Sequence, residues 1–172
     1  LAFCRELAPL LTAGILAGQV GSAFAAELGS MRVTEQIDAL KMLRTNPIDY
    51  LVIPRVIACC LMLPVLNIFS LVTGIVGGGV VGVLFYGVRP AIFLASVHLF
   101  LGTSDLINVV LKGFIFGAVI AVISCSWGLT TTGGVKGVGR SATGAVVTSW
   151  VSIFAVDFFL SWALFQELGI AV

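Results

Sequence analysis

Charged side chains are scarce in this sequence, and a few of them lie inside strongly apolar stretches. Lys112 and Asp157 each lie within such a stretch, and Asp105 lies about two helical turns before Lys112. Arg5 and Glu6 come directly before a further apolar stretch. A charge that faces lipid costs at least about 2.5–3.5 kcal/mol on membrane-insertion scales. We therefore expect these groups to pair with one another or to line a polar cavity. An ion pair that only locks two helices and a charged lining for the head group of an amphiphilic substrate are both compatible with the pattern.

No catalytic or metal-binding constellation accompanies these charges in the sequence. The single histidine, His98, has no ligand partner close in sequence. The cysteines form no C-x-x-C pair and lie in apolar surroundings, so we interpret them as free, buried thiols: Cys4, Cys59, Cys60 and Cys125. We expect no metal and no cofactor on this chain, and an enzyme acting alone is not indicated.

Two near-matches to nucleotide-binding motifs overlap in one glycine-rich segment. Gly134 to Ser141 differs from a P-loop by one letter, with Arg140 in place of the lysine, and Gly137 to Ala142 fits G-x-G-x-x-A. Both motifs require a preceding strand and a soluble α/β domain. This segment follows an apolar stretch of membrane length, so we interpret residues 130–143 as a polar, flexible, basic loop.

The amphipathic stretch 33–44 lies between two apolar segments. At helical spacing its apolar side chains share one face: Val33, Ile37, Leu40 and Leu43. Polar side chains cover most of the rest: Glu35, Gln36, Asp38, Lys41 and Arg44. Ser30 and Thr34 are the expected N-caps, and Asn46–Pro47 is the expected stop. A helix this short lies at the membrane interface or docks onto another protein.

Composition places the whole chain in the membrane. The sequence has 172 residues, of which 59% are hydrophobic and 10% charged, and its mean hydropathy is +1.17. Soluble domains have about 45–50% apolar and about 25% charged residues. We therefore predict an all-α integral membrane protein with one domain. The net charge of +1 gives no indication of nucleic-acid binding.

Apolar segments long enough to cross a bilayer, about 20 residues, occur at 7–26, 53–86, 106–129 and 144–168. The second is expected to be one long helix kinked at Pro64, with a broken helix as the alternative. Residues 90–101 are too short to span and are expected to form an outer interfacial helix.

The first span is rich in small residues, and Gly14, Gly18 and Gly21 allow close helix packing in a bundle or a dimer. Basic residues are concentrated in the first and third connections, which indicates that both face the cytoplasm or stroma. The C-terminus then lies outside.

Three adjoining blocks carry a family resemblance. These are RELAPLLTAGILAGQVGSAFAAELG, ELGSMRVTEQIDAL and NPIDYLVIPRV. Together they resemble the MlaE-type permeases, the membrane subunits of ABC phospholipid transporters that work with Mce-domain proteins. The resemblance runs from about Arg5 to the C-terminus. The later block VISCSWGLTTTGGVKGVGRSATGAVV is most similar to the chloroplast and cyanobacterial, trigalactosyldiacylglycerol-type branch.

The resemblance implies partners and a fold. It implies a permease homodimer, two cytoplasmic ATPase subunits that carry ATP and Mg, and an Mce-domain lipid-binding protein on the outer side. The family fold has five transmembrane helices and an N-terminal interfacial helix. Four spans are visible here, so we expect the interfacial helix and the first transmembrane helix to be missing from this sequence.

The resemblance also implies roles for residues. Residues 33–44 would be the coupling helix received by a groove in the ATPase, and residues 7–26 would line the dimer cavity. Polar groups that the family places in the outer half of the membrane match Glu6, Asp105, Lys112 and Asp157. The membrane would be a bacterial or cyanobacterial inner membrane or the plastid inner envelope.

The leading hypothesis is a lipid-translocating permease subunit that ATP-driven closure of its ATPase partners moves through residues 33–44. The alternative is an ion-coupled secondary transporter or channel in which Lys112 and Asp157 relay a proton or an ion. A purely structural bundle subunit is the third possibility.

Overall fold

The computed structural model describes residues 6–87, 89–100 and 102–167. All regular elements in these ranges are helical, and they are α1 (Ala8–Leu16), η2 (Ala17–Gly21), α2 (Ser22–Val33), α3 (Gln36–Met42), η3 (Ile48–Val52), α4 (Ile53–Tyr86), α5 (Pro90–Phe100), α6 (Thr103–Leu129) and α7 (Gly134–Glu167). The elements η2 and η3 are single turns of π-helix that continue into the neighbouring α-helices.

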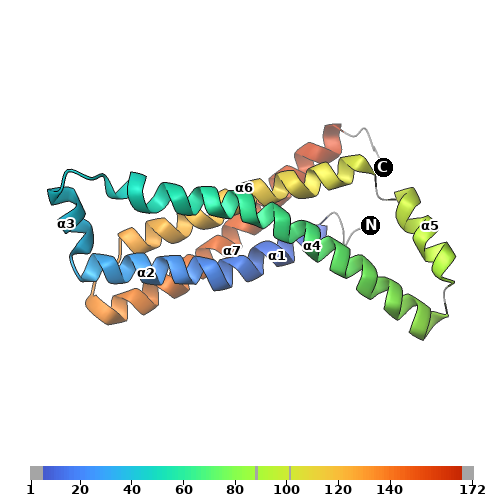
Figure 1. The fold of residues 1–172 in the computed structure, drawn as a ribbon, viewed down its shortest axis with the longest axis horizontal. Coiled ribbons are helices and arrows are strands. Elements are labelled where there is room, and N and C mark those ends of the chain that lie inside the picture. The colour runs from blue at the N-terminus through green and yellow to red at the C-terminus, as the bar shows by residue number, and fades with distance from the viewer. Residues whose placement is uncertain (1–5, 88, 101, 168–172) are drawn as a thin grey trace.

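Four of the described helices are long and apolar enough to cross a membrane: Ala8–Val33, Ile48–Tyr86, Ser104–Leu129 and Gly134–Ala163. They run along the long axis of the molecule, with α3 at one end and α5 at the other (Figure 1). The turn between α6 and α7 lies at the α3 end. The predicted all-α membrane architecture is confirmed.

A row of small residues lets α1, η2 and α2 pack closely inside the bundle. Ala13, Ala17 and Ala25 are fully buried and Gly21 is buried with them. A Cβ added at Gly21 would lie 2.8 Å from Ser124 Oγ of α6. Only very small side chains allow helices to approach so closely, so this face packs within the chain, against α6 and α7.

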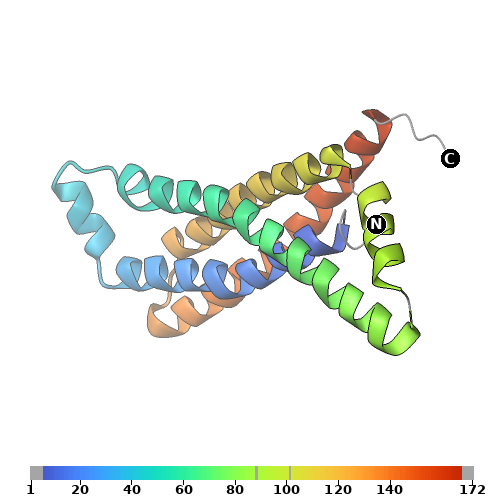
Figure 2. The ribbon, with the colours of Figure 1, turned by 45° about the vertical axis from the view of Figure 1, so that its right-hand side comes forward.

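The helix α4 is continuous through Pro64, so the broken-helix alternative is wrong. Two glycines of α6 accommodate this part of α4. A Cβ at Gly113 would lie 2.9 Å from Pro64 Cα, and one at Gly117 would lie 2.7 Å from the Cys59 carbonyl oxygen. Beyond this crossing, the last turns of α4 diverge from the other spans together with α5 (Figures 1 and 2).

The predicted loop at 130–143 is largely helical, because α7 begins at Gly134. The turn before it uses Gly133 and Gly134 with φ of 87° and 66°, which glycine adopts without strain. The hydroxyl groups of Thr131 and Ser141 are 2.8 Å apart and tie the first turns of α7 to the end of α6. The glycine content suggested a loop, but this tertiary contact holds the segment in a helix.

The amphipathic helix is shorter than predicted, because α3 covers only Gln36–Met42 and Val33 closes α2. Thr34 does not cap α3: its hydroxyl donates to the Ser30 carbonyl oxygen at 2.9 Å, within the end of α2. The N-cap position belongs to Glu35, with φ of 60° and no side-chain cap. The N-cap expectation was therefore wrong.

The helix α3 ends slightly before the predicted stop at Asn46–Pro47. The chain leaves α3 at Leu43 and turns at Arg44, whose φ is 57°. Asn46 and Pro47 instead begin the next helix, where the Ile48 amide donates to Asn46 Oδ1 at 3.2 Å. A side-chain-capped turn at this position explains why the sequence pattern suggested a boundary.

Candidate functional site

A buried charge cluster joins the start of the chain to α6 and α7. Lys112 Nζ lies 2.7 Å from Glu6 Oε2, 2.9 Å from Asp157 Oδ1 and 2.9 Å from Ser161 Oγ. The ammonium group donates hydrogen bonds to Glu6 and Ser161, and its contact with Asp157 is an ion pair. The Ser161 hydroxyl in turn donates to the Glu6 carboxylate at 3.0–3.1 Å. The predicted pairing of Lys112 with Asp157 is confirmed.

The cluster holds one ammonium and two carboxylate groups in a poorly solvated place. The side chain of Lys112 is 2% exposed, that of Asp157 14% and that of Glu6 33%. Burying charges requires that they be paired and hydrogen-bonded. The arrangement meets this requirement for Lys112, which is paired with both carboxylates and hydrogen-bonded to Glu6 and Ser161. Glu6 is the most exposed of the three charged side chains.

Two further residues were expected in this cluster, Asp105 and Arg5. Asp105 is 5% exposed and accepts a hydrogen bond from the Gly102 amide at 3.2 Å, where it caps the start of α6. Arg5 lies outside the described residues. Ser161 was missed, although its place one helical turn after Asp157 puts both side chains on the same face.

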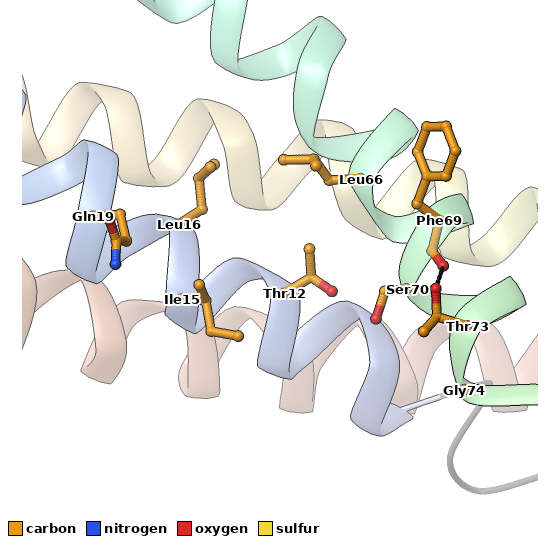
Figure 3. Close-up of a pocket in the computed structure, with 9 residues that line it drawn as sticks. All are labelled: Thr12, Ile15, Leu16, Gln19, Leu66, Phe69, Ser70, Thr73 and Gly74. Atoms are coloured by element: carbon orange, nitrogen blue, oxygen red, sulfur yellow. Dashed lines mark hydrogen bonds between the residues drawn. The ribbon is translucent and has the colours of Figure 1, made fainter. Parts of the chain in front are cut away.

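A groove of about 530 Å³ lies between α1–η2 and α4 (Figure 3). One face of each helix lines it: Thr12, Ile15, Leu16, Gln19, Leu66, Phe69, Ser70, Thr73 and Gly74. Thr12 and Thr73 direct their hydroxyl groups to carbonyl oxygens of their own helices, at 2.8 Å in each case. The surface left to the groove is therefore mainly apolar, with Gln19 and Ser70 as polar positions.

The glycines expected at a packing face or cavity have different surroundings. A Cβ on Gly14 would overlap the ring of Trp150, and Gly21 faces Ser124, so both pack within the chain. Gly18 has no atom within 4 Å of the position of a Cβ. None of the three lines the groove.

An exposed charge network covers α3 and its entry. Asp38 Oδ1 accepts from Arg32 Nη1 at 3.0 Å and from Lys41 Nζ at 3.3 Å. The hydrogen bond from Lys41, with a further contribution from Arg32, holds the pKa of Asp38 below its usual range. Glu35 and Arg44, at the two ends of α3, are also exposed.

The apolar side chains of residues 33–44 do not form one outward face. Ile37 is 2% exposed and Val33 and Leu40 are half-buried, whereas Leu43 is 75% exposed. Met42, which the sequence pattern did not single out, is 87% exposed. The expectation that Ile37 is available to a partner was wrong, because the turn at Glu35 folds that side chain inward.

A second contact at this end was not foreseen from the sequence. Arg55 Nη2 of α4 lies 2.9 Å from Glu27 Oε2 of α2, and the guanidinium carbon lies 5.0 Å from the centre of the Phe24 ring. The contact links the two spans that α3 connects.

Three of the four cysteines lie within the described residues. Cys59, Cys60 and Cys125 are free thiols; Cys59 and Cys125 are buried, as expected, whereas Cys60 is half-buried. Cys4 lies outside the described residues. The side chain of His98 is also outside them. In the described ranges no group of three or more His, Cys, Asp or Glu side chains could hold a metal ion.

Comparison with known proteins gives consistent matches. The family described as Permease MlaE matches residues 1–163. The probable ABC transporter permease protein slr1045 of Synechocystis sp. is 60% identical over 98% of this chain and 64% of its own length. Protein TRIGALACTOSYLDIACYLGLYCEROL 1, chloroplastic, of Arabidopsis thaliana is 51% identical over 98% of this chain and 48% of its own length. The probable ABC transporter permease protein ycf63 of Porphyra purpurea is 52% identical over the whole chain and 65% of its own length. This chain thus spans about half to two thirds of these relatives.

Proposed function

This chain belongs to the MlaE permease family, and on that basis we propose that it is the membrane subunit of an ABC transporter for phospholipid or another glycerolipid. A separate ATPase subunit, which binds ATP and Mg, supplies the energy. The chain works in a bacterial or cyanobacterial inner membrane or in the plastid inner envelope. The name of one relative is that of a galactose-bearing glycerolipid, which supports this substrate class.

The groove between α1–η2 and α4 carries the proposal. Its volume of about 530 Å³ and its mainly apolar lining suit acyl chains better than an ion or a polar metabolite. Ile15 and Phe69, which line it, are 67% and 66% exposed, so the groove is open at the surface of a single chain. A second copy of this chain would close it, and an Mce-domain protein on the outer side would exchange lipid with it.

The helix α3 and the residues that follow it, at the opposite end of the molecule from α5, form the proposed contact with the ATPase. Met42 and Leu43 present exposed apolar side chains beside Lys41 and Arg44. A conformational change driven by ATP requires contacts that differ between two states, and α3 is the exposed helix that joins two spans at this end of the molecule.

The ion-coupled alternative draws on the buried cluster. Two carboxylates share one ammonium there, as in proton-relay sites. That alternative requires transport that follows membrane potential or pH and continues without ATP. Lipid transfer that stops when ATP is withheld would decide for the ABC permease.

The decisive experiment replaces the exposed pair, Met42→Asp together with Leu43→Asp, in the full-length protein. We expect recovery of the co-purified ATPase to fall at least about tenfold, because charge replaces apolar contact area at the interface. ATP-dependent lipid transfer between vesicles should fall with it. Gln36→Asp is the matched control, since it adds a charge to an exposed position of the same helix and should leave both readouts intact. Full ATPase recovery and lipid transfer in the double variant would contradict the coupling role.

A further inference from the structure

The contact of Arg55 with Glu27 and Phe24 joins the two membrane spans that α3 connects. Phe24 and Glu27 belong to the first half of α2, which leads into α3, and Arg55 belongs to the first turn of α4, which follows α3 and η3. One side chain therefore bridges the helix before the α3 connection and the helix after it.

The geometry fixes Arg55 more firmly than an exposed ion pair would. Its side chain is 17% exposed, its Nη2 lies 2.9 Å from Glu27 Oε2, and its guanidinium carbon lies 5.0 Å from the Phe24 ring centre. A guanidinium that pairs with a carboxylate and also stacks on an aromatic ring is held in both direction and distance. A flexible lysine could not reproduce this geometry.

Stability alone is a weak reason for this arrangement. Arg55 Nη1 is buried without a hydrogen-bond partner among the described residues, and the loss of hydration of a buried charge offsets much of its attraction. Glu27 is 63% exposed, so water screens its side of the pair. What the contact provides is a fixed spacing between α2 and α4.

We infer that Arg55 is a positioning residue that makes α2 and the start of α4 move as one unit when α3 is displaced. The inference rests on the proposed function, because the motion it transmits is the one that the ATPase imposes on α3. Without the Arg55–Glu27 contact, α3 would still bind the ATPase, but its displacement would be absorbed by a change in the spacing between α2 and α4. ATP hydrolysis would then continue with less lipid moved.

The test compares Arg55→Met with Arg32→Met in the intact transporter. Both changes remove a cation that pairs with an acidic residue at the α3 end, but Arg32 bonds Asp38 within the α2–α3 segment and does not bridge to α4. In Arg55→Met we expect normal recovery of the ATPase and a fall of at least about fivefold in lipid transferred per ATP hydrolysed, the lower end of typical coupling energies. In Arg32→Met we expect this ratio to stay within about twofold, below that range. An equal fall in both variants, or in neither, would overturn the inference.

A second measurement does not depend on transport. Spin labels at positions 30 and 49, on either side of α3, should give a broader distance distribution in Arg55→Met and an unchanged one in Arg32→Met. If Arg55→Met fails to fold, Glu27→Gln replaces it, because that side chain is mostly exposed and its loss removes only the ion pair. An unchanged distance distribution in Arg55→Met overturns the inference even if the transporter is ATP-driven. Absence of ATP-dependent transfer in the unaltered protein, with a broadened distribution in the variant, overturns the proposed function instead.

Discussion

Two charge clusters in this molecule have mirror-image compositions. In the membrane span, Lys112 lies between two carboxylates at 2.7 and 2.9 Å. On α3, Asp38 lies between two cations at 3.0 and 3.3 Å. The central side chain is 2% exposed in the first cluster and 53% exposed in the second. Since water screens the second and not the first, nearly equal contacts differ greatly in energy.

The comparison separates a fixed part of the molecule from an adaptable one. The buried cluster ties the start of the chain, α6 and α7 together, and breaking it strands charges away from water. The α3 network can exchange partners with solvent or with another protein at little cost. A transport subunit needs both properties, because a helix that docks onto a soluble partner must not be committed to its own chain.

The largest expected effect is that of Lys112→Met. This change leaves the carboxylates of Glu6 and Asp157 without their common partner, and removal of one member of a buried ion pair costs about 3–5 kcal/mol. The free energy of unfolding in detergent or nanodiscs measures the loss. Asp38→Ala, the corresponding change in the α3 cluster, should leave that free energy unchanged.

A triple variant sharpens this result. With Lys112→Met, Glu6→Gln and Asp157→Asn combined, no charge remains to be stranded, and most of the lost stability should return. A triple variant as unstable as Lys112→Met alone would show that shape, and not charge, holds the three segments together.

The sequence predicted the buried region better than the exposed one. A charge inside an apolar span has few options, so Lys112 and Asp157 could be paired from their depth alone. Glu6 was assigned to the same outer half, but its place at the cluster depends on how the first span packs. Ser161 lies on the same helical face as Asp157, so its place in the cluster could also have been predicted from the sequence spacing.

At the α3 end the local pattern was insufficient. The periodicity of Ile37, Leu40 and Leu43 is real, but a left-handed turn at Glu35 rotates the helix so that Ile37 faces inward. Nothing in sequence spacing requires that turn. The Arg55–Glu27 contact likewise joins residues of two different spans, so only the tertiary packing reveals it. The helical start of α7 depends on Thr131 and Ser141 in the same way.

A substitution with an intermediate expected effect, Gly14→Ala, tests whether tight packing without charge also contributes to stability. Gly14→Ala places a methyl group against the ring of Trp150, and overpacking of this kind costs about 1–3 kcal/mol. Gly18→Ala belongs to the same G-x-x-x-G motif but meets no atom within 4 Å, so it should cause no loss. The thermal midpoints of the two variants give the comparison. Equal midpoints would mean that the bundle relaxes around Gly14, and the contrast between the two regions would then rest on charge alone.

The smallest expected effect concerns the pKa of Asp38. The hydrogen bond from Lys41 contributes most to the lowered pKa, so Lys41→Met should return the pKa toward its ordinary value, and Arg32→Met should raise it less. A folded-state pKa below the unfolded one adds stability above about pH 4, which is lost as the pH falls through the folded value. Because Asp38 is exposed, the change should appear in a carboxyl NMR titration and not in the unfolding midpoint at neutral pH. A shift in that midpoint would mean that the α3 network supports the fold as the Lys112 cluster does, and α3 would then not be the adaptable element that docking to an ATPase requires.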